Sequence, residues 1–187
     1  GGGGGKPSSG AQKPQPHTVS NVLLRLRPVK ACADIPGLDQ GERGGPVNAA
    51  TCNPKPEDNQ YWSLELVHPS AGPGGAALFQ IRNIKSKYCM DLGGGFGNKP
   101  HGSPVVMFGC NGNTAGNQLW WLEKQDDETY WIRNNTSSGR CLDWTGPSNS
   151  NDPARLALRI HDCRKGEDIW QIVTTERNSW QITHPFG

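Results

Sequence analysis

Hydrophobic and polar residues alternate in short stretches from Val19 onward. This two-residue period is typical of a strand with one buried face, and it occurs at 21–27, 78–82, 130–133, 157–161 and 180–184. Clusters of Gly, Pro and Asn, such as 93–100 and 145–153, separate the stretches and are typical of turns. No segment keeps the apolar period of an amphipathic helix. The pattern predicts an all-β domain of short strands.

The composition narrows the class of protein. The 187 residues include 25 Gly and 15 Pro, and only 33% are hydrophobic and 19% charged, against about 45–50% and 25% in ordinary globular domains. These values exclude a helical bundle and a coiled coil. The net charge of +2 argues against nucleic acid as the main partner. No apolar run is long enough to predict a membrane span.

The start of the chain differs from the rest. Residues 1–18 are rich in Gly and Pro and contain no large apolar side chain. We therefore expect a flexible linker to an N-terminal partner domain, with a cloning remnant as the alternative. The sequence shows neither an initiator Met nor a signal-peptide pattern, so we expect it to be a fragment of a longer protein. The folded domain is expected to cover residues 19–187.

The six cysteines define three repeats. Consecutive pairs, at 32 and 52, 89 and 110, and 141 and 163, are separated by 20, 21 and 22 positions. The first cysteine of each pair opens a Cys-x-Asp motif, and a Trp follows the second within ten residues; these are Asp34, Asp91 and Asp143, and Trp62, Trp120 and Trp170. The pattern predicts structural repeats at about 19–66, 78–124 and 129–173, with a C-terminal extension at 174–187. Closing three such units on one another would remove exposed strand edges.

These motifs resemble the ricin B-type lectin family, whose members are β-trefoil carbohydrate-binding modules. The family pattern is Cys-x-Asp, a second Cys about twenty residues later and a closing Gln-x-Trp, repeated three times. Gln-x-Trp is intact at Gln60 and Gln118, whereas Asp168 replaces the Gln in the third copy. The resemblance implies a β-trefoil whose centre is built from the three repeated Trp residues. We also expect Trp131, on an alternating strand, in the core. The strand at 180–184 is extra, and would either dock on an exposed edge or replace the opening strand at 22–27.

The cysteine spacing alone leaves fifteen disulfide connectivities. The repeat symmetry selects Cys32–Cys52, Cys89–Cys110 and Cys141–Cys163, with six reduced thiols as the alternative. Each bridge would close a loop of about 20 residues, worth roughly 3 kcal/mol. Because disulfides persist in oxidising compartments, we expect an extracellular or cell-surface location. The sequence contains no Cys-x-x-Cys pair, which argues against zinc and redox sites.

The resemblance also implies where sugar would bind. The family uses the Asp of Cys-x-Asp, an aromatic residue two places before the second Cys, and the Asn before Gln-x-Trp. The second repeat matches best, and its candidate residues are Asp91, Phe108, Asn117 and Gln118. The third repeat offers Asp143, His161 and Asp168, and is either a site of altered specificity or a degenerate copy. The first offers Asp34, Asn59 and Gln60 but has Ala50 in place of the aromatic residue, so we expect little binding there. In each repeat the alternative is that these residues only maintain the fold.

The function predicted from these observations is non-catalytic carbohydrate binding, as a lectin module of a larger secreted or surface protein. A galactose-type sugar or a polysaccharide such as xylan would suit the site. No catalytic motif is present, and we expect no metal and no cofactor. Two alternatives remain: a protein-binding or receptor-targeting trefoil of the toxin-subunit type, and the sensing ectodomain of a membrane-anchored regulator.

Overall fold

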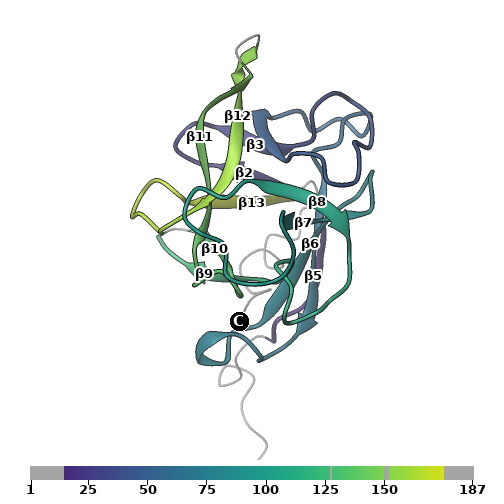
Figure 1. The fold of residues 1–187 in the computed structure, drawn as a ribbon. Helices are drawn as coiled ribbons and strands as arrows, with labels where there is room; N and C mark the ends of the chain where they lie inside the picture. Colours follow the sequence, from purple (N-terminus) through teal and green to yellow (C-terminus); the bar gives the residue numbers. More distant parts are fainter. Residues whose placement is uncertain (1–14, 127, 150–151, 175–187) are drawn as a thin grey trace, which may run out of the picture.

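A computed structural model describes residues 15–126, 128–149 and 152–174 and contains twelve β-strands with one short 3-10 turn, η2 (Pro73–Gly75) (Figure 1). The strands are β2 (Val19–Leu26), β3 (Ala31–Asp34), β4 (Asn48–Thr51), β5 (Trp62–His68), β6 (Leu78–Asn83), β7 (Tyr88–Leu92), β8 (Val105–Gly109), β9 (Trp120–Lys124), β10 (Thr129–Asn134), β11 (Cys141–Asn149), β12 (Asp152–His161) and β13 (Trp170–Thr174). The predicted strand at 180–184 and most of the predicted linker lie outside the described residues. In the described part no helix is long and apolar enough to cross a membrane.

Six of the strands form a closed barrel. β2 pairs with β13 and β5, β6 pairs with β5 and β9, and β10 pairs with β9 and β13, all antiparallel. The opening strand β2 is therefore part of the barrel and is not displaced. Closure satisfies the backbone hydrogen bonds of strands that would otherwise be exposed at an edge.

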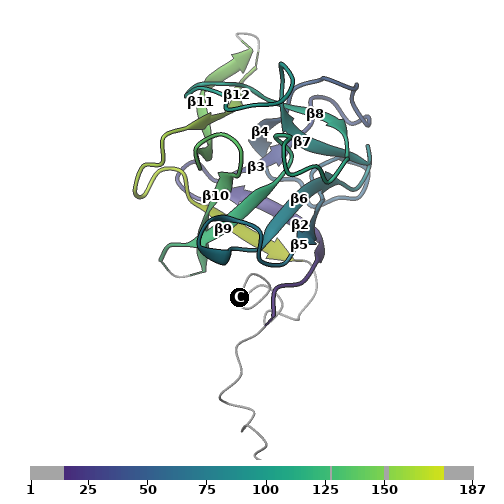
Figure 2. The ribbon, with the colours of Figure 1, turned by 60° about the horizontal axis from the view of Figure 1, so that its bottom comes forward.

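The other six strands form three hairpins, β3–β4, β7–β8 and β11–β12. They lie together toward the top of Figure 2, with the barrel strands below them. Each repeat thus contributes its first and last strands to the barrel and its middle two to a hairpin. This is the β-trefoil that the resemblance implied, and the all-β prediction is confirmed.

The repeated Trp residues occupy the core, as predicted. Trp62, Trp120 and Trp170 are fully buried. Each indole N–H donates to the carbonyl of the middle residue of its own Cys-x-Asp motif: Trp62 to Ala33 at 3.1 Å, Trp120 to Met90 at 3.4 Å and Trp170 to Leu142 at 3.0 Å. The indole therefore fixes the strand that carries the motif while it fills the barrel.

The three predicted disulfides are confirmed. They join Cys32 to Cys52, Cys89 to Cys110 and Cys141 to Cys163, with Cα atoms 4.9, 5.2 and 5.1 Å apart. Each links the strand that bears the Cys-x-Asp motif to the chain that leaves the same hairpin. The bridge therefore holds together the two strands from which the candidate sugar-binding residues project.

Two local predictions are wrong. The Gly/Pro/Asn segment 145–153 was expected to be a turn, but β11 runs to Asn149 and β12 starts at Asp152, so most of it extends the third hairpin. The pairing is irregular on both sides of Pro147, and such irregularities accommodate Pro within a strand. Trp131 is only half-buried, because Tyr130 and Ile132 take the inward positions of β10.

Candidate functional site

The hairpin register places the candidate residues of each repeat on one face. The first Cys lies directly opposite the residue two places before the second Cys: Cys89 faces Phe108, Cys32 faces Ala50 and Cys141 faces His161. Side chains two residues apart in a strand share a face, so the Asp of Cys-x-Asp lies beside that residue. Each hairpin therefore presents one carboxylate and one neighbouring position suited to a flat ring, which we call the platform position.

The Gln of Gln-x-Trp forms a hydrogen bond to the Asp carboxylate of its own repeat. Gln118 donates from Nε2 to Asp91 Oδ2 at 3.0 Å and to the Gly109 carbonyl at 2.8 Å, and its Oε1 accepts from the Asn111 N–H at 3.0 Å. Gln60 makes the same three contacts in the first repeat. Both Gln residues are 1% exposed. Both Gln side chains thus form their hydrogen bonds inside the protein. They would affect ligand binding indirectly, by fixing the position of the carboxylate.

The Asn before each motif supports the loop that follows Cys-x-Asp. Asn117 donates from Nδ2 to the Gly95 carbonyl at 3.1 Å, while its Oδ1 accepts from Thr136 and, at 3.1 Å, from Ser137. Asn59 correspondingly donates to the carbonyls of Gly37 and Asp39 and accepts from the Ile35 N–H. Both are buried, and the side-chain oxygen and nitrogen of each take part in at least one hydrogen bond. They shape the floor of the site rather than offering free hydrogen-bonding groups to it.

The second repeat has an open pocket of about 350 Å³. The four predicted residues Asp91, Phe108, Asn117 and Gln118 all line it, together with Arg43 and Phe96. Asp91 Oδ1 accepts from the Leu92 N–H at 2.7 Å and Oδ2 from Gln118. Within the described residues no cation is paired with this carboxylate. Phe96, which the sequence analysis did not single out, is 64% exposed in a loop where Gly94, Gly95 and Gly97 have positive φ.

The carboxylate of the first repeat is occupied by an ion pair. Arg155, from β12 of the third repeat, donates to Asp34 Oδ2 while Gln60 donates to Oδ1 at 3.2 Å. Asp34 is 1% exposed, and its burial raises the pKa of the carboxyl although Arg155 offsets part of the effect. A pocket of about 330 Å³ remains at this place, and Asp34, Ala50 and Arg155 are among the residues that line it. Asp34, Asn59 and Gln60 are therefore brought together, but with the carboxylate already occupied.

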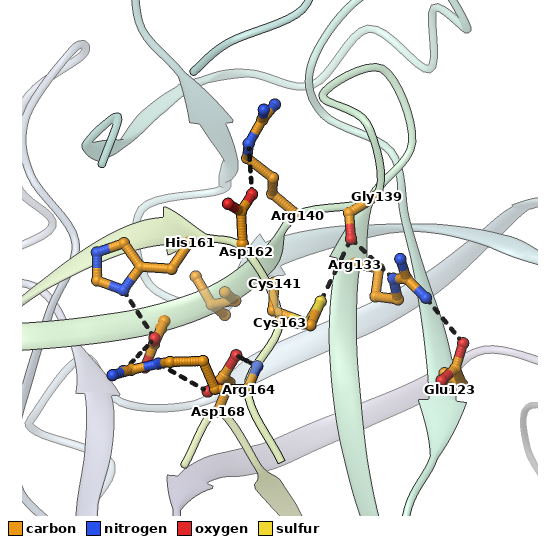
Figure 3. The surroundings of a disulfide bond; sticks show 12 residues. Glu123, Arg133, Gly139, Arg140, Cys141, His161, Asp162, Cys163, Arg164 and Asp168 are labelled. Atoms are coloured by element: carbon orange, nitrogen blue, oxygen red, sulfur yellow. Dashed lines mark hydrogen bonds and ion pairs between the residues drawn. A yellow bond between two sulfur atoms is a disulfide. The ribbon is translucent and has the colours of Figure 1, made fainter. Parts of the chain in front are cut away.

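The carboxylate of the third repeat is also occupied. Asp143 is fully buried, and its Oδ2 accepts from His161 Nδ1 at 2.7 Å and from Arg164 at 2.8 Å. Figure 3 shows His161 and Arg164 directed toward the same carboxylate. The backbone N–H of Trp144 donates to the other oxygen at 2.8 Å. All of the acceptor atoms of Asp143 are thus engaged by its own chain.

Asp168 explains why the third Gln could be lost. Its Oδ2 accepts from the Arg164 N–H at 2.6 Å, which reproduces the contact that Gln118 receives from Asn111. An ionised aspartate cannot donate, and the Arg164 side chain supplies the hydrogen bond to Asp143 that the missing Gln would have made. Burial, with the nearby Asp143 carboxylate, raises the pKa of Asp168 to about 7, although the backbone contact from Arg164 lowers it.

Comparison with known proteins identifies the family. The sequence matches the ricin-type β-trefoil lectin domain over residues 22–171. The chain belongs to this family. Domains of the family are non-catalytic carbohydrate-binding modules, and the observed fold agrees with that assignment. No curated protein sequence matches the chain.

Several solved structures share the fold of this ricin-type lectin domain. The designed threefold-symmetric protein ThreeFoil is 19% identical with a TM-score of 0.63, over 81% of this chain and 96% of that one. The exo-β-1,3-galactanase 1,3Gal43A from Clostridium thermocellum is 18% identical with a TM-score of 0.60, over 84% of this chain but only 30% of the galactanase. The cytolethal distending toxin of Actinobacillus actinomycetemcomitans is 16% identical with a TM-score of 0.58, over 84% and 97%. At these identities the likeness shows the shared fold.

Each repeat of the lectin domain also places one basic side chain against a candidate residue of a neighbouring repeat. Arg43 lies 5.1 Å above the Phe108 ring, His101 stacks on His161 with ring centroids 4.6 Å apart, and Arg155 pairs with Asp34. These three residues precede Cys52, Cys110 and Cys163 by nine, nine and eight positions. The sequence analysis missed them, although a basic residue at this recurring distance from the second Cys is a signal that a repeat alignment contains.

Proposed function

We propose that this lectin domain binds glycan through the pocket of the second repeat and that the equivalent carboxylates of the other two repeats are occupied by the protein's own basic side chains. The observation that carries the proposal is the state of the three equivalent carboxylates. Asp34 pairs with Arg155, and Asp143 accepts from His161 and Arg164, whereas Asp91 is paired with no cation among the described residues.

The free acceptor capacity of Asp91 suits sugar hydroxyls. An ionised carboxylate has about four lone-pair sites, and the Leu92 N–H and Gln118 use one on each oxygen. The remaining sites face a pocket, where hydroxyl groups would form charge-assisted hydrogen bonds. Phe108 and Phe96 line the same pocket and supply apolar surface for the C–H face of a pyranose. Gln118 and Asn117 contribute by holding the carboxylate and the loop in place.

One shallow site of this kind gives modest affinity. A dissociation constant near 1 mM corresponds to about −4 kcal/mol. Such a module is effective when a second binding surface or an attached domain raises the local concentration. We therefore propose that the chain acts within a larger protein, an arrangement supported by analogy with the galactanase, of which the matched fold covers only 30%. Three disulfides support a secreted or surface location.

The test is titration with a panel of galactose-, xylose- and β-1,3-galactose-based oligosaccharides, followed by calorimetry and amide chemical shifts. We expect the backbone amides of Gly94, Gly95 and Gly109, which line the pocket, to shift on binding. Asp91→Asn should weaken binding by at least about tenfold, because one acceptor oxygen becomes a donor. Asp34→Asn, the same substitution at the equivalent place in the first repeat, is the matched control and should leave affinity unchanged.

Two results would contradict the proposal. One is the absence of binding to every glycan of the panel by a correctly folded protein. The other is equal affinity of the wild type and Asp91→Asn. Binding to cells or proteins that persists in Asp91→Asn and is insensitive to sugars would instead favour a receptor-targeting role.

A further inference from the structure

Arg43 reaches the second pocket by an extension of the sheet. The chain around it pairs with the edge of β8: the Gly44 N–H donates to the Met107 carbonyl at 2.6 Å, and the Met107 N–H donates to the Gly45 carbonyl at 3.0 Å. The Val47 N–H continues the ladder to the Val105 carbonyl at 3.1 Å. A segment of the first repeat is thus fixed along the pocket of the second. The position of Arg43 follows from backbone pairing rather than from a free loop.

The guanidinium of Arg43 is held by an aromatic face and leaves its donors available. Its central carbon lies 5.1 Å from the centroid of the Phe108 ring. A guanidinium carries five N–H donors, and within the described residues the Arg43 side chain donates no hydrogen bond to the protein. Within the described residues Arg43 has no ion pair, in contrast to Arg82, Arg133, Arg140, Arg155 and Arg164, each of which pairs with a carboxylate.

A second cation lies at the same pocket. The Lys99 ammonium donates to the carbonyl of Gly94, a lining residue, at 2.9 Å and has no ion pair in the described part of the chain. The pocket is therefore lined by one anionic side chain, Asp91, and one cationic side chain, Arg43, and Lys99 contacts one of its lining residues. A neutral sugar would satisfy Asp91 with its hydroxyls but would leave the charge of Arg43 without a partner.

The equivalent arginine shows what this position can bind. Arg155 stands in the first pocket where Arg43 stands in the second, and its guanidinium is paired with the Asp34 carboxylate. The difference lies at the platform position, which is Ala50 in the first repeat and Phe108 in the second. The ring of Phe108 holds Arg43, and no carboxylate of the described residues pairs with this arginine.

We infer that the second pocket selects acidic glycans, in which a sugar carries a carboxylate or a sulfate. Asp91 accepts hydrogen bonds from the hydroxyls of the sugar, and the N–H edge of Arg43 binds its anionic substituent, with Lys99 adding positive potential. Planar, in-plane donors suit a carboxylate or sulfate group better than a hydroxyl. The inference rests on the proposed function, because it assigns a ligand class to the same pocket.

The experiment compares matched ligands on the whole chain. Galactose oligomers are titrated against galacturonate oligomers of equal length, and galactose against galactose 6-sulfate, at low and high salt. We expect the anionic member of at least one pair to bind about tenfold more tightly at low salt. That preference should shrink as salt is added, because exposed charge pairs are screened.

Two variants with the same change in charge assign the preference. Arg43→Gln should bring the anionic and neutral members of the pair to similar affinities. Arg27→Gln, at an exposed arginine outside the pocket, is the matched control and should keep the preference. A preference for sulfate alone or for carboxylate alone distinguishes the two sources of anionic charge and supports the inference in either case.

The possible failures are separable. Equal affinity for neutral and anionic ligands, with Asp91→Asn still abolishing both, would overturn the acidic-glycan inference and leave the proposed function intact. A preference that survives in Arg43→Gln would also overturn it. Stronger binding of neutral sugar by Arg43→Gln would show that Arg43 covers the platform instead of binding ligand. Binding of neither member of any pair would overturn the proposed function and the inference together.

Discussion

Removal of Arg155 tests whether its ion pair with Asp34 holds the carboxylate of the first repeat. The substitution Arg155→Met keeps an unbranched side chain about as long as the aliphatic part of the arginine and removes the charged group. Asp34 is 1% exposed, so its carboxylate would remain buried with only Gln60 as a side-chain donor. Breaking a buried pair by removing one partner costs about 3–5 kcal/mol. We expect about 3 kcal/mol at pH 7, the low end, because Gln60 remains and the pair borders a pocket.

The loss should depend on pH. Burial already raises the pKa of Asp34, and Arg155 is among the causes that lower it. Without Arg155 the pKa rises further, so the folded variant holds a proton that the unfolded chain releases above its usual pKa near 4. The stability of the variant should therefore fall more steeply than that of the wild type as pH rises from acid to neutral. Near pH 3.5 the carboxyl is largely neutral in both states, and the difference should be smallest.

The assay is urea denaturation with the disulfides intact, followed by Trp fluorescence at pH 3.5 and pH 7. Thermal denaturation gives a second readout, since about 3 kcal/mol corresponds to a fall in Tm of roughly 6–12 °C for a domain of this size. The double variant Arg155→Met with Asp34→Asn removes the orphaned charge and should recover most of the lost stability. A loss of stability below 1 kcal/mol, or an equal loss at both pH values, would refute a stabilising ion pair between Arg155 and the buried Asp34 carboxylate.

Two further predictions concern stability at other places. Burial raises the pKa of Asp168 to about 7 from an ordinary value near 3.8, so the wild type should lose stability as pH rises between these values. In urea denaturation, Asp168→Asn should therefore be more stable than the wild type at pH 8, by at most about 4 kcal/mol, and as stable as the wild type near pH 4. A gain in stability that does not depend on pH would contradict this explanation. Trp120→Ala, at a fully buried side chain, should lower the free energy of unfolding by about 3–5 kcal/mol. Phe96→Ala, at a side chain that is 64% exposed, should change it by less than about 0.5 kcal/mol but weaken glycan binding several-fold. Unchanged glycan affinity of this variant would show that Phe96 is not part of the site.

The fold was predictable because its determinants recur within each repeat. Cys-x-Asp, the second Cys and the closing Trp lie close together in sequence, and three copies restrict both the architecture and the disulfide pairing. The errors arose where one local signal was read alone. Gly, Pro and Asn in 145–153 indicated a turn, but pairing within the third hairpin overrode them. At Trp131 the alternation was correct but its phase was not, and a shift of one residue exchanges the two faces of a strand.

The candidate residues were predictable from the sequence, but the basic side chains that neighbouring repeats place beside them were not. Sequence motifs locate Asp34, Asp91 and Asp143 because each lies next to a Cys of its own repeat. Arg155 reaches Asp34 across 121 positions of sequence, and Arg43 likewise enters the second pocket from the first repeat. Such contacts depend on how neighbouring repeats pair at the hairpin edges. The motif of a single repeat carries no information about them.

The platform position controls more than the surface on which a sugar stacks. Where this position holds a ring, the basic residue from the neighbouring repeat stacks on it: Arg43 on Phe108, and His101 on His161. Where it is Ala50, the arginine reaches past it and neutralises the carboxylate. The Phe108 ring therefore holds Arg43 away from Asp91. As a result, the Asp91 carboxylate can still accept hydrogen bonds from a ligand. In the third repeat the ring itself binds the carboxylate, because imidazole can donate a hydrogen bond where a phenyl group cannot. In these three repeats the side chain at the platform position thus influences whether a basic side chain of the protein reaches the carboxylate.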